Sequence, residues 1–159
     1  MLFVRPGPGA PGTHRLGGTE MKGLLSLAIG SLVLLAACGA PVAGAATGGA
    51  VRATLTDTAI ALDHPSVSAG QVVFNVKNAG TVVHELVVIK TTLAADQIPA
   101  DIDEPGKVHE EGSKGESGDV EAGKTASFTL NLDPGTYVLI CNEAGHYAIG
   151  MRIAFQVTK

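Results

Sequence analysis

A cysteine, a histidine and a methionine follow one another at five-residue intervals in the last part of the chain. They are Cys141, His146 and Met151, on a turn-like segment between two apolar runs. A thiolate, an imidazole and a thioether are soft or borderline metal ligands. With a second imidazole they form the trigonal His₂Cys set with a weak axial Met that holds copper at blue-copper sites. The spacing therefore predicts a copper site that needs one more histidine from elsewhere in the chain.

A predicted strand upstream of this loop supplies the second histidine. His84 lies in the run 82–88 (VVHELVV), which is nearly continuously apolar after the histidine, as in strands buried on both faces. It is the only histidine upstream of the loop that falls on a predicted strand. Taken singly, each of these residues has a plainer interpretation as part of an apolar core. Their combination favours metal binding.

Short apolar runs separated by turn residues fill the chain downstream of residue 50. Strands are predicted at 52–62, 71–78, 82–90, 124–132, 137–141 and 152–158. The segment 93–98 has the pattern of a short helix, and the polar stretch 91–121 is a connection of a length that is usually functional or mobile. Many short strands with little helix predict an all-β Greek-key sandwich, with the Cys141 loop between its last two strands.

Six residues in two segments carry a resemblance to a known family. They follow the patterns Asn-x-Gly-x₃-His and Cys-x₄-His-x₄-Met, at Asn78, Gly80, His84, Cys141, His146 and Met151. In these residues the chain resembles the cupredoxins, and the resemblance covers 51–159. The spacing of the ligand loop is similar to that of rusticyanin and sulfocyanin rather than to the shorter loops of plastocyanin and azurin.

The resemblance implies a two-sheet β-sandwich that binds one copper ion at one end. His84, Cys141 and His146 would be the equatorial ligands, and Met151 would be the axial ligand. Many cupredoxins place Asn after the first histidine, where it ties the two ligand segments together, and here Glu85 takes that place. A buried charge there would stabilise Cu(II) and lower the reduction potential, or its pKa would rise. We expect Glu85 to face solvent or to bond backbone amides.

Residues 1–37 are predicted to be an N-terminal extension followed by a signal peptide. A basic start at 21–23 precedes the apolar run 24–35, which is shorter than the ~20 residues of a membrane-spanning helix. The run ends in Leu-Ala-Ala-Cys-Gly at 35–39, which resembles the lipobox of bacterial lipoproteins. The resemblance implies that Cys38 is lipidated and anchors the chain at the outer face of a bacterial membrane. An ordinary secretory signal is the alternative.

The chain after the signal peptide is predicted to consist of a flexible tether at 38–50, made of small uncharged residues, and a folded domain at 51–159. Cys38 and Cys141 are the only cysteines, so a disulfide between them is the alternative to separate roles. The formal net charge is −4, and residues 38–159 carry −6. This balance argues against nucleic acid, which needs a basic surface, and is compatible with a basic protein partner.

These features favour one-electron transfer as the function. We expect a monomeric type 1 (blue) copper carrier, lipid-anchored at the extracytoplasmic face of a membrane, with redox partners such as a basic cytochrome or an oxidase. The alternative is a lipoprotein that buffers or delivers copper from an open, exchange-prone site. Methionine- or histidine-rich tracts would favour that alternative, and the sequence has none. Catalysis is not expected, because the sequence lacks both the two-cysteine loop of dinuclear copper centres and the His-x-His motifs of multicopper oxidases.

Overall fold

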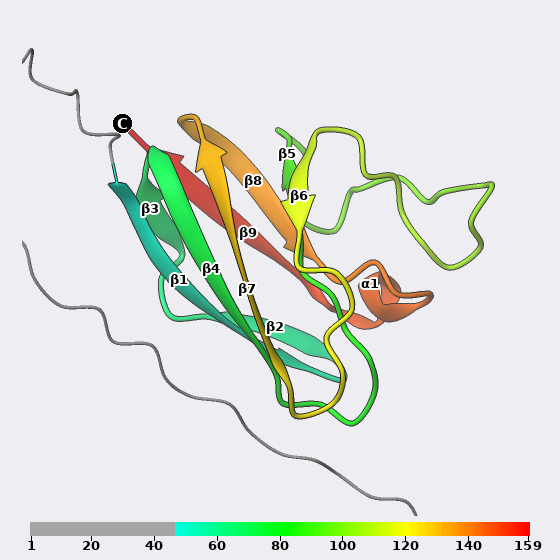
Figure 1. Cartoon of the computed structure of the whole chain (residues 1–159). Helices are drawn as coiled ribbons and strands as arrows, with labels where there is room; N and C mark the ends of the chain where they lie inside the picture. The colour runs from blue at the N-terminus through cyan, green and yellow to red at the C-terminus, as the bar shows by residue number, and fades with distance from the viewer. Residues whose placement is uncertain (1–46) are drawn as a thin grey trace, which may run out of the picture. The chain divides into compact units, whose positions relative to one another are not determined.

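The computed structural model describes residues 47–159, which form two β-sheets packed against each other and one short helix (Figure 1). The first sheet, in the order β2-β1-β4-β7, consists of Ala59–Leu62, Thr47–Thr56, Gly70–Asn78 and Thr125–Leu132. The second sheet, in the order β3-β9-β8-β5-β6, consists of Ser66–Ser68, Arg152–Thr158, Gly135–Ile140, Val87–Lys90 and Ser113–Glu116. The helix α1 spans His146–Ile149. The predicted all-β sandwich is confirmed.

An apolar core between the two sheets holds them together. The alternating pattern of β4 directs Val72, Phe74 and Val76 inward, where all three are buried. The Phe74 ring stacks on Phe128 of β7, with 5.2 Å between ring centroids, and meets Phe155 of β9 edge-on at 5.9 Å. Such aromatic pairs contribute about 0.5–1.5 kcal/mol beyond the apolar area that they bury. Because β7 and β9 belong to different sheets, Phe74 joins the two layers.

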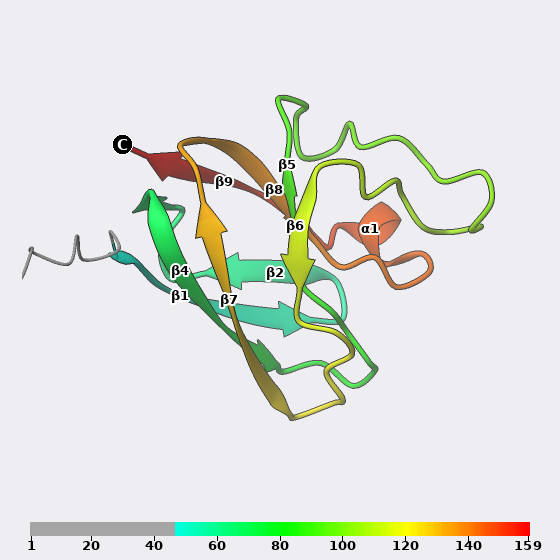
Figure 2. The ribbon, with the colours of Figure 1, turned by 45° about the horizontal axis from the view of Figure 1, so that its top comes forward.

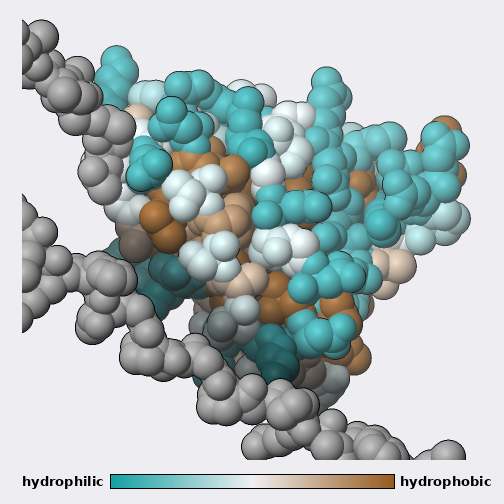
Figure 3. All heavy atoms as spheres, viewed as in Figure 1, coloured by the Kyte–Doolittle hydropathy of each residue, from teal (hydrophilic) through white to brown (hydrophobic). Residues whose placement is uncertain are grey.

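The second sheet is buried on its outer face as well. In β8, Leu139 belongs to the core between the sheets, whereas Val138 and Ile140 belong to a second apolar cluster that includes Ile98 and Val108. Ile98 and Val108 come from the long connection after β5, which therefore packs over the sheet. The surface of this connection is mostly hydrophilic (Figure 3). Burial on both faces explains why β5 and β8 are almost continuously apolar.

The segment predicted as one strand at 52–62 is a hairpin. β1 and β2 pair antiparallel, and the chain reverses at Asp57 and Thr58. The tip of this hairpin lies at the same end of the sandwich as the loop 141–151 (Figure 2). A Cβ atom added at Gly150 would lie only 3.0 Å from the Thr58 carbonyl oxygen. The hairpin thus brings a turn to the predicted metal site.

Two other local predictions were wrong. His84 does not lie on a regular strand: it forms an isolated bridge with Val120, and β5 begins three residues later. No helix forms at 93–98. There the Ile98 N–H donates to the Tyr147 hydroxyl at 3.0 Å, so a tertiary hydrogen bond takes the place of a helical one.

The predicted connection 91–121 also contains a strand, β6. β1 begins at Thr47, within the segment predicted as a tether. The signal peptide predicted at 1–37, the lipidation site Cys38 and the tether residues before Thr47 lie outside the described residues. Within 47–159, no helix has the length and apolar character needed to cross a membrane.

Candidate metal centre

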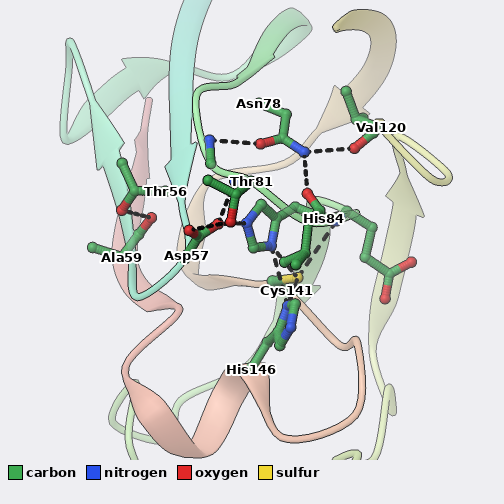
Figure 4. A network of polar contacts seen from close by, with 12 residues as sticks. Thr56, Asp57, Ala59, Asn78, Thr81, His84, Val120, Cys141 and His146 are labelled. Carbon is green, nitrogen blue, oxygen red and sulfur yellow. Dashed lines mark hydrogen bonds and ion pairs between the residues drawn. The ribbon is translucent and has the colours of Figure 1, made fainter. Parts of the chain in front are cut away.

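Three of the predicted ligands converge where the loop 141–151 meets the segment before β5 (Figure 4). The Nδ1 atoms of His84 and His146 lie 3.1 Å apart. The Cys141 Sγ atom lies 3.3 Å from His146 Nδ1 and 3.8 Å from His84 Nδ1. His84 and Cys141 are fully buried, whereas His146 is partly exposed. Cys141 is a free thiol.

The three donor atoms fit a single metal ion. A point equidistant from atoms separated by 3.1, 3.3 and 3.8 Å lies about 2.0 Å from each of them, and metal–nitrogen and metal–sulfur bonds in proteins measure about 2.0–2.3 Å. One thiolate and two imidazoles in a trigonal arrangement are the donors that hold copper at blue-copper sites. The residues present therefore fit copper, both in chemistry and in spacing.

Met151 closes the loop that carries two of these donors. The Cys141 N–H donates to the Met151 carbonyl at 3.0 Å, and the Met151 N–H donates to the His146 carbonyl at 3.1 Å. Gly145 and Gly150 flank α1 within the loop, with φ angles of 87° and 124° that glycine adopts without strain. Met151 is fully buried. Its role as the axial ligand stays a prediction.

Asn78 holds the segment that carries His84. Its side-chain amide donates to the Val82 and Val120 carbonyls, both at 2.7 Å, and its Oδ1 accepts the Gly80 N–H at 2.8 Å. His84 and Val120 also exchange two backbone hydrogen bonds, at 3.2 and 2.8 Å. Asn78 is fully buried, so these bonds satisfy a polar group that burial would otherwise destabilise. They fix the backbone on which His84 stands.

Asp57, at the tip of the β1–β2 hairpin, contacts the other nitrogen of the His84 ring. Its Oδ1 atom lies 3.2 Å from His84 Nε2. The same carboxylate accepts hydrogen bonds from the Thr81 N–H at 2.7 Å and the Thr81 hydroxyl at 2.9 Å. These bonds hold the pKa of Asp57 below its ordinary value. Asp57 could not be assigned to the site from the sequence, because it lies 27 residues before His84 and only the unpredicted hairpin brings it there.

The Cys141 thiol lies in a setting that keeps it protonated until a metal binds. Burial is the main cause that raises the pKa of this thiol. The Glu85 N–H donates to Sγ at 3.4 Å, which favours the thiolate. Burial is the main cause that lowers the pKa of His146, and the neighbouring His84 lowers it further. This imidazole is therefore neutral at pH 7 and offers a lone pair. Metal binding is therefore expected to release the thiol proton.

Glu85 ties the two ligand segments together. Its Oε1 accepts the N–H of Asn142, the residue after Cys141, at 3.2 Å. The sequence led us to expect that Glu85 either faces solvent or bonds backbone amides. It bonds a backbone amide, and its side chain is partly buried. Burial raises the pKa of Glu85 to about 7, and three further carboxylates add to the shift: Glu116, Glu110 and Glu143.

The Asn142 side chain fastens the ligand loop to the long connection that covers the second sheet. Its Oδ1 accepts the Val108 N–H at 2.9 Å, and its Nδ2 donates to the Val108 carbonyl at 3.0 Å and to Glu110 at 2.8 Å. Close by, the Gly145 N–H donates to the Gly106 carbonyl at 2.8 Å. The connection therefore supports the loop from outside. This role of Asn142 could not be predicted from the sequence, because its partners lie more than thirty residues away.

Comparisons with known proteins agree with this geometry. Residues 50–158 match the family described as copper binding proteins, plastocyanin/azurin family. Dithionite-reduced auracyanin from the photosynthetic bacterium Roseiflexus castenholzii has a similar structure, with a TM-score of 0.54 and 21% identity over 71% of this chain and 98% of the auracyanin. Auracyanin B is similar too, with a TM-score of 0.53 and 21% identity over 71% of this chain and 91% of its own.

Reduced rusticyanin has a TM-score of 0.52 at 16% identity, over 70% of this chain and 81% of the rusticyanin. At these identities the likeness to solved structures establishes the fold alone. No curated protein sequence matches the chain. The family match, in contrast, spans both sheets and all four predicted ligand positions. The chain belongs to the plastocyanin/azurin family of copper-binding proteins.

Proposed function

We propose that the chain is a type 1 (blue) copper protein that carries one electron at a time. In this proposal His84, Cys141, His146 and Met151 would hold the copper ion. The observation that carries it is the convergence of one thiol and two imidazoles at the spacing of a single metal ion, in a chain that belongs to a copper-binding family.

When bound, copper supplies a one-electron couple between Cu(II) and Cu(I). The chain's own residues keep the donor atoms in place. Asn78 fixes the backbone of His84, Glu85 joins that segment to Asn142, and Asn142 fastens the ligand loop to the covering connection. Ligands held from several sides move little when the charge of the site changes. Small rearrangement suits an electron carrier.

The burial of the donors supports a carrier over a copper-delivery protein. Delivery requires an open site from which the ion exchanges readily. His84, Cys141 and Met151 are all fully buried, and only His146 is partly exposed. A closed site of this kind retains its ion. Donor burial therefore favours electron transfer over copper delivery.

The surface next to His146 supports a protein partner of basic character. Ile149, in the same loop, is exposed and offers an apolar contact close to this ligand. Two carboxylates, on Asp119 and Glu143, cluster nearby with that of Glu85, with oxygen atoms within 4.8 Å of one another, and Glu85 adds only part of a negative charge at pH 7 because burial raises its pKa to about 7. Complementary charge increases the rate of encounter between proteins. We therefore propose a basic redox protein, such as a cytochrome, as the partner of a monomeric carrier.

We further propose that Cys38 is lipidated and holds the domain at the outer face of a bacterial membrane. The support is the lipobox-like sequence at 35–39. Cys38→Ser is expected to move the protein, expressed in a bacterium, from the membrane fraction to the soluble fraction. The Cys141→Ser variant should stay with the membrane. Unmodified protein found in the soluble fraction would contradict the anchor.

A copper titration tests the proposed electron carrier. Purified protein is expected to develop an intense blue colour with one equivalent of Cu(II), because Cu–thiolate charge transfer absorbs strongly at such sites. A one-electron reductant should bleach the colour and an oxidant should restore it, without loss of copper. Colourless protein, or copper lost during one cycle, would instead favour delivery.

A further inference from the structure

The turn between β1 and β2 reaches a ring nitrogen of a proposed copper ligand. His84 has two ring nitrogens, and Nδ1 faces Cys141 and His146. The other nitrogen, Nε2, lies 3.2 Å from Asp57 Oδ1 (Figure 4). The His84 side chain is 0% exposed and that of Asp57 is 42% exposed. The contact thus joins a buried imidazole to a carboxylate at the surface.

The carboxylate is held in place by bonds that do not involve His84. Thr81 donates to it twice, from its N–H to Oδ1 at 2.7 Å and from its hydroxyl to Oδ2 at 2.9 Å. Thr81 therefore holds both carboxylate oxygens in position independently of the imidazole. Thr81 belongs to the short segment between Asn78 and His84, so the hairpin is fastened to the segment that carries the ligand.

Gly80 provides the space in which this contact forms. A Cβ atom at this position would lie 2.2 Å from Asp57 Oδ1 and 2.7 Å from His84 Nε2, closer than real contacts allow. The Gly80 N–H is held by Asn78 Oδ1 at 2.8 Å, so the backbone is not free to move away. Any side chain at this position would separate the carboxylate from the imidazole. The lack of a side chain at Gly80 is a second, independent feature that supports the same contact.

The chemistry of the pair determines which nitrogen carries the proton. An aspartate is ionised at neutral pH, since its ordinary pKa is about 3.9, and an ionised carboxylate only accepts hydrogen bonds. The His84 proton is then on Nε2, donated to Asp57, and the lone pair is on Nδ1. Nδ1 is the atom that faces the other two donors. In metalloproteins a carboxylate behind a ligating histidine fixes the ring orientation and raises the basicity of the ligand.

We propose that Asp57 is a positioning residue of the copper site: it holds the His84 proton on Nε2, presents Nδ1 to the metal and, through its charge, favours Cu(II) over Cu(I). The inference rests on the ligation by His84 proposed above. It adds a residue from a separate hairpin, outside both segments that carry the proposed ligands. It also assigns Thr81 and Gly80 a common role, which is to support this one contact.

Asp57→Asn removes the charge while it keeps the size and an accepting oxygen. The matched control is Asp63→Asn. Asp63 lies after β2, at the other end of the same hairpin, and its carboxylate likewise accepts a backbone N–H, from Arg52 at 2.8 Å. The control changes the net charge by the same amount without touching a proposed ligand. Thermal unfolding of both variants checks that each is folded.

The first readout is the reduction potential of the copper protein. Asp57→Asn is expected to favour Cu(I) about tenfold relative to the unmodified protein, which is about 59 mV for a one-electron couple, in line with the 10–100-fold effects of such partners on metal affinity. Asp63→Asn should shift the potential far less. Equal shifts in the two variants, or none in Asp57→Asn, would mean that Asp57 acts as a distant surface charge or not at all, and would overturn the proposal.

The second readout needs no copper. In the metal-free, unmodified protein, ¹⁵N NMR of the histidine rings is expected to show His84 as the Nε2–H tautomer. A predominant Nδ1–H tautomer would overturn the role of Asp57 even if the protein turned blue with copper. Conversely, the Nε2–H tautomer in a protein that never turns blue would leave the positioning contact intact and count against the proposed electron transfer. The two failures are thus distinguishable.

Discussion

Cys141→Ser is expected to abolish the blue colour of the copper-loaded protein. The intense visible band of such sites comes from charge transfer between the thiolate and Cu(II), and a serine hydroxyl at the same place supplies no thiolate. The side chain is fully buried at the end of β8. Serine is close in size, and the Glu85 N–H that contacts Sγ can donate to the serine oxygen instead. The variant should therefore fold, and a visible spectrum with one equivalent of Cu(II) measures the result.

Cys38→Ser is the control for this experiment, because it removes the chain's other cysteine. It should keep the full visible band. Copper-bound Cys141→Ser protein that still absorbs intensely in the visible would overturn the assignment of Cys141 as the ligand. Loss of the band in Cys38→Ser would show that the spectrum depends on the wrong cysteine. Circular dichroism of both variants separates a lost ligand from a lost fold.

Met151→Leu is expected to keep copper and the blue colour but to raise the reduction potential. The thioether of an axial methionine is a weak donor that stabilises Cu(II), and leucine removes it. A shift of about tenfold in favour of Cu(I) corresponds to about 59 mV. The swap nearly conserves volume, so its cost in stability should stay below about 1.5 kcal/mol although Met151 is fully buried. Cyclic voltammetry of the copper protein measures the shift.

Leu139→Met offers a matched control for the disturbance of packing. Leu139 lies in the same buried cluster as Met151, on β8, but outside the ligand loop. The control should leave the potential near that of the unmodified protein. A Met151→Leu protein with unchanged potential would contradict the axial role, whereas one that no longer binds copper would contradict the weakness of this donor. Equal shifts in the two variants would point to packing rather than ligation.

The ligand residues could be predicted because their information is local. Cys141, His146 and Met151 fall within one loop, so their types and spacing are visible without any tertiary contact. The sandwich could be predicted for a similar reason, since alternating or continuous apolar runs report how each strand is buried. β4 and β7 lie close to their predicted ranges. His84 was found by its place upstream of the loop, although it stands in an isolated bridge rather than on a regular strand.

The supporting residues could not be predicted in this way. Glu85 is visible in the sequence as a departure from the family pattern, but whether it faces solvent or bonds a backbone amide depends on how close Asn142 comes to it. Asp57 falls inside one continuous predicted strand because the partial alternation of 52–62 runs through it, although Asp is depleted in strands and common in turns and was a signal for the reversal. The connection 91–121 was recognised as polar and long, yet its few apolar residues, Ile98 and Val108, cover a sheet.

The sequence by itself determined the family and the all-β class, and it predicted the donor set. Cys141, His146 and Met151 follow from residue types at short, fixed offsets, and His84, 57 residues before Cys141, follows from its place in an apolar run upstream of the loop. Only the tertiary structure decided which polar groups form hydrogen bonds to the donor residues and support them. Asp57 meets His84 through the reversal of the chain at the β1–β2 turn, and through the space that Gly80 leaves. Hydrogen bonds of this kind depend on distances of a few tenths of an ångström between segments far apart in the chain, and the order of residues along the chain does not encode those distances locally.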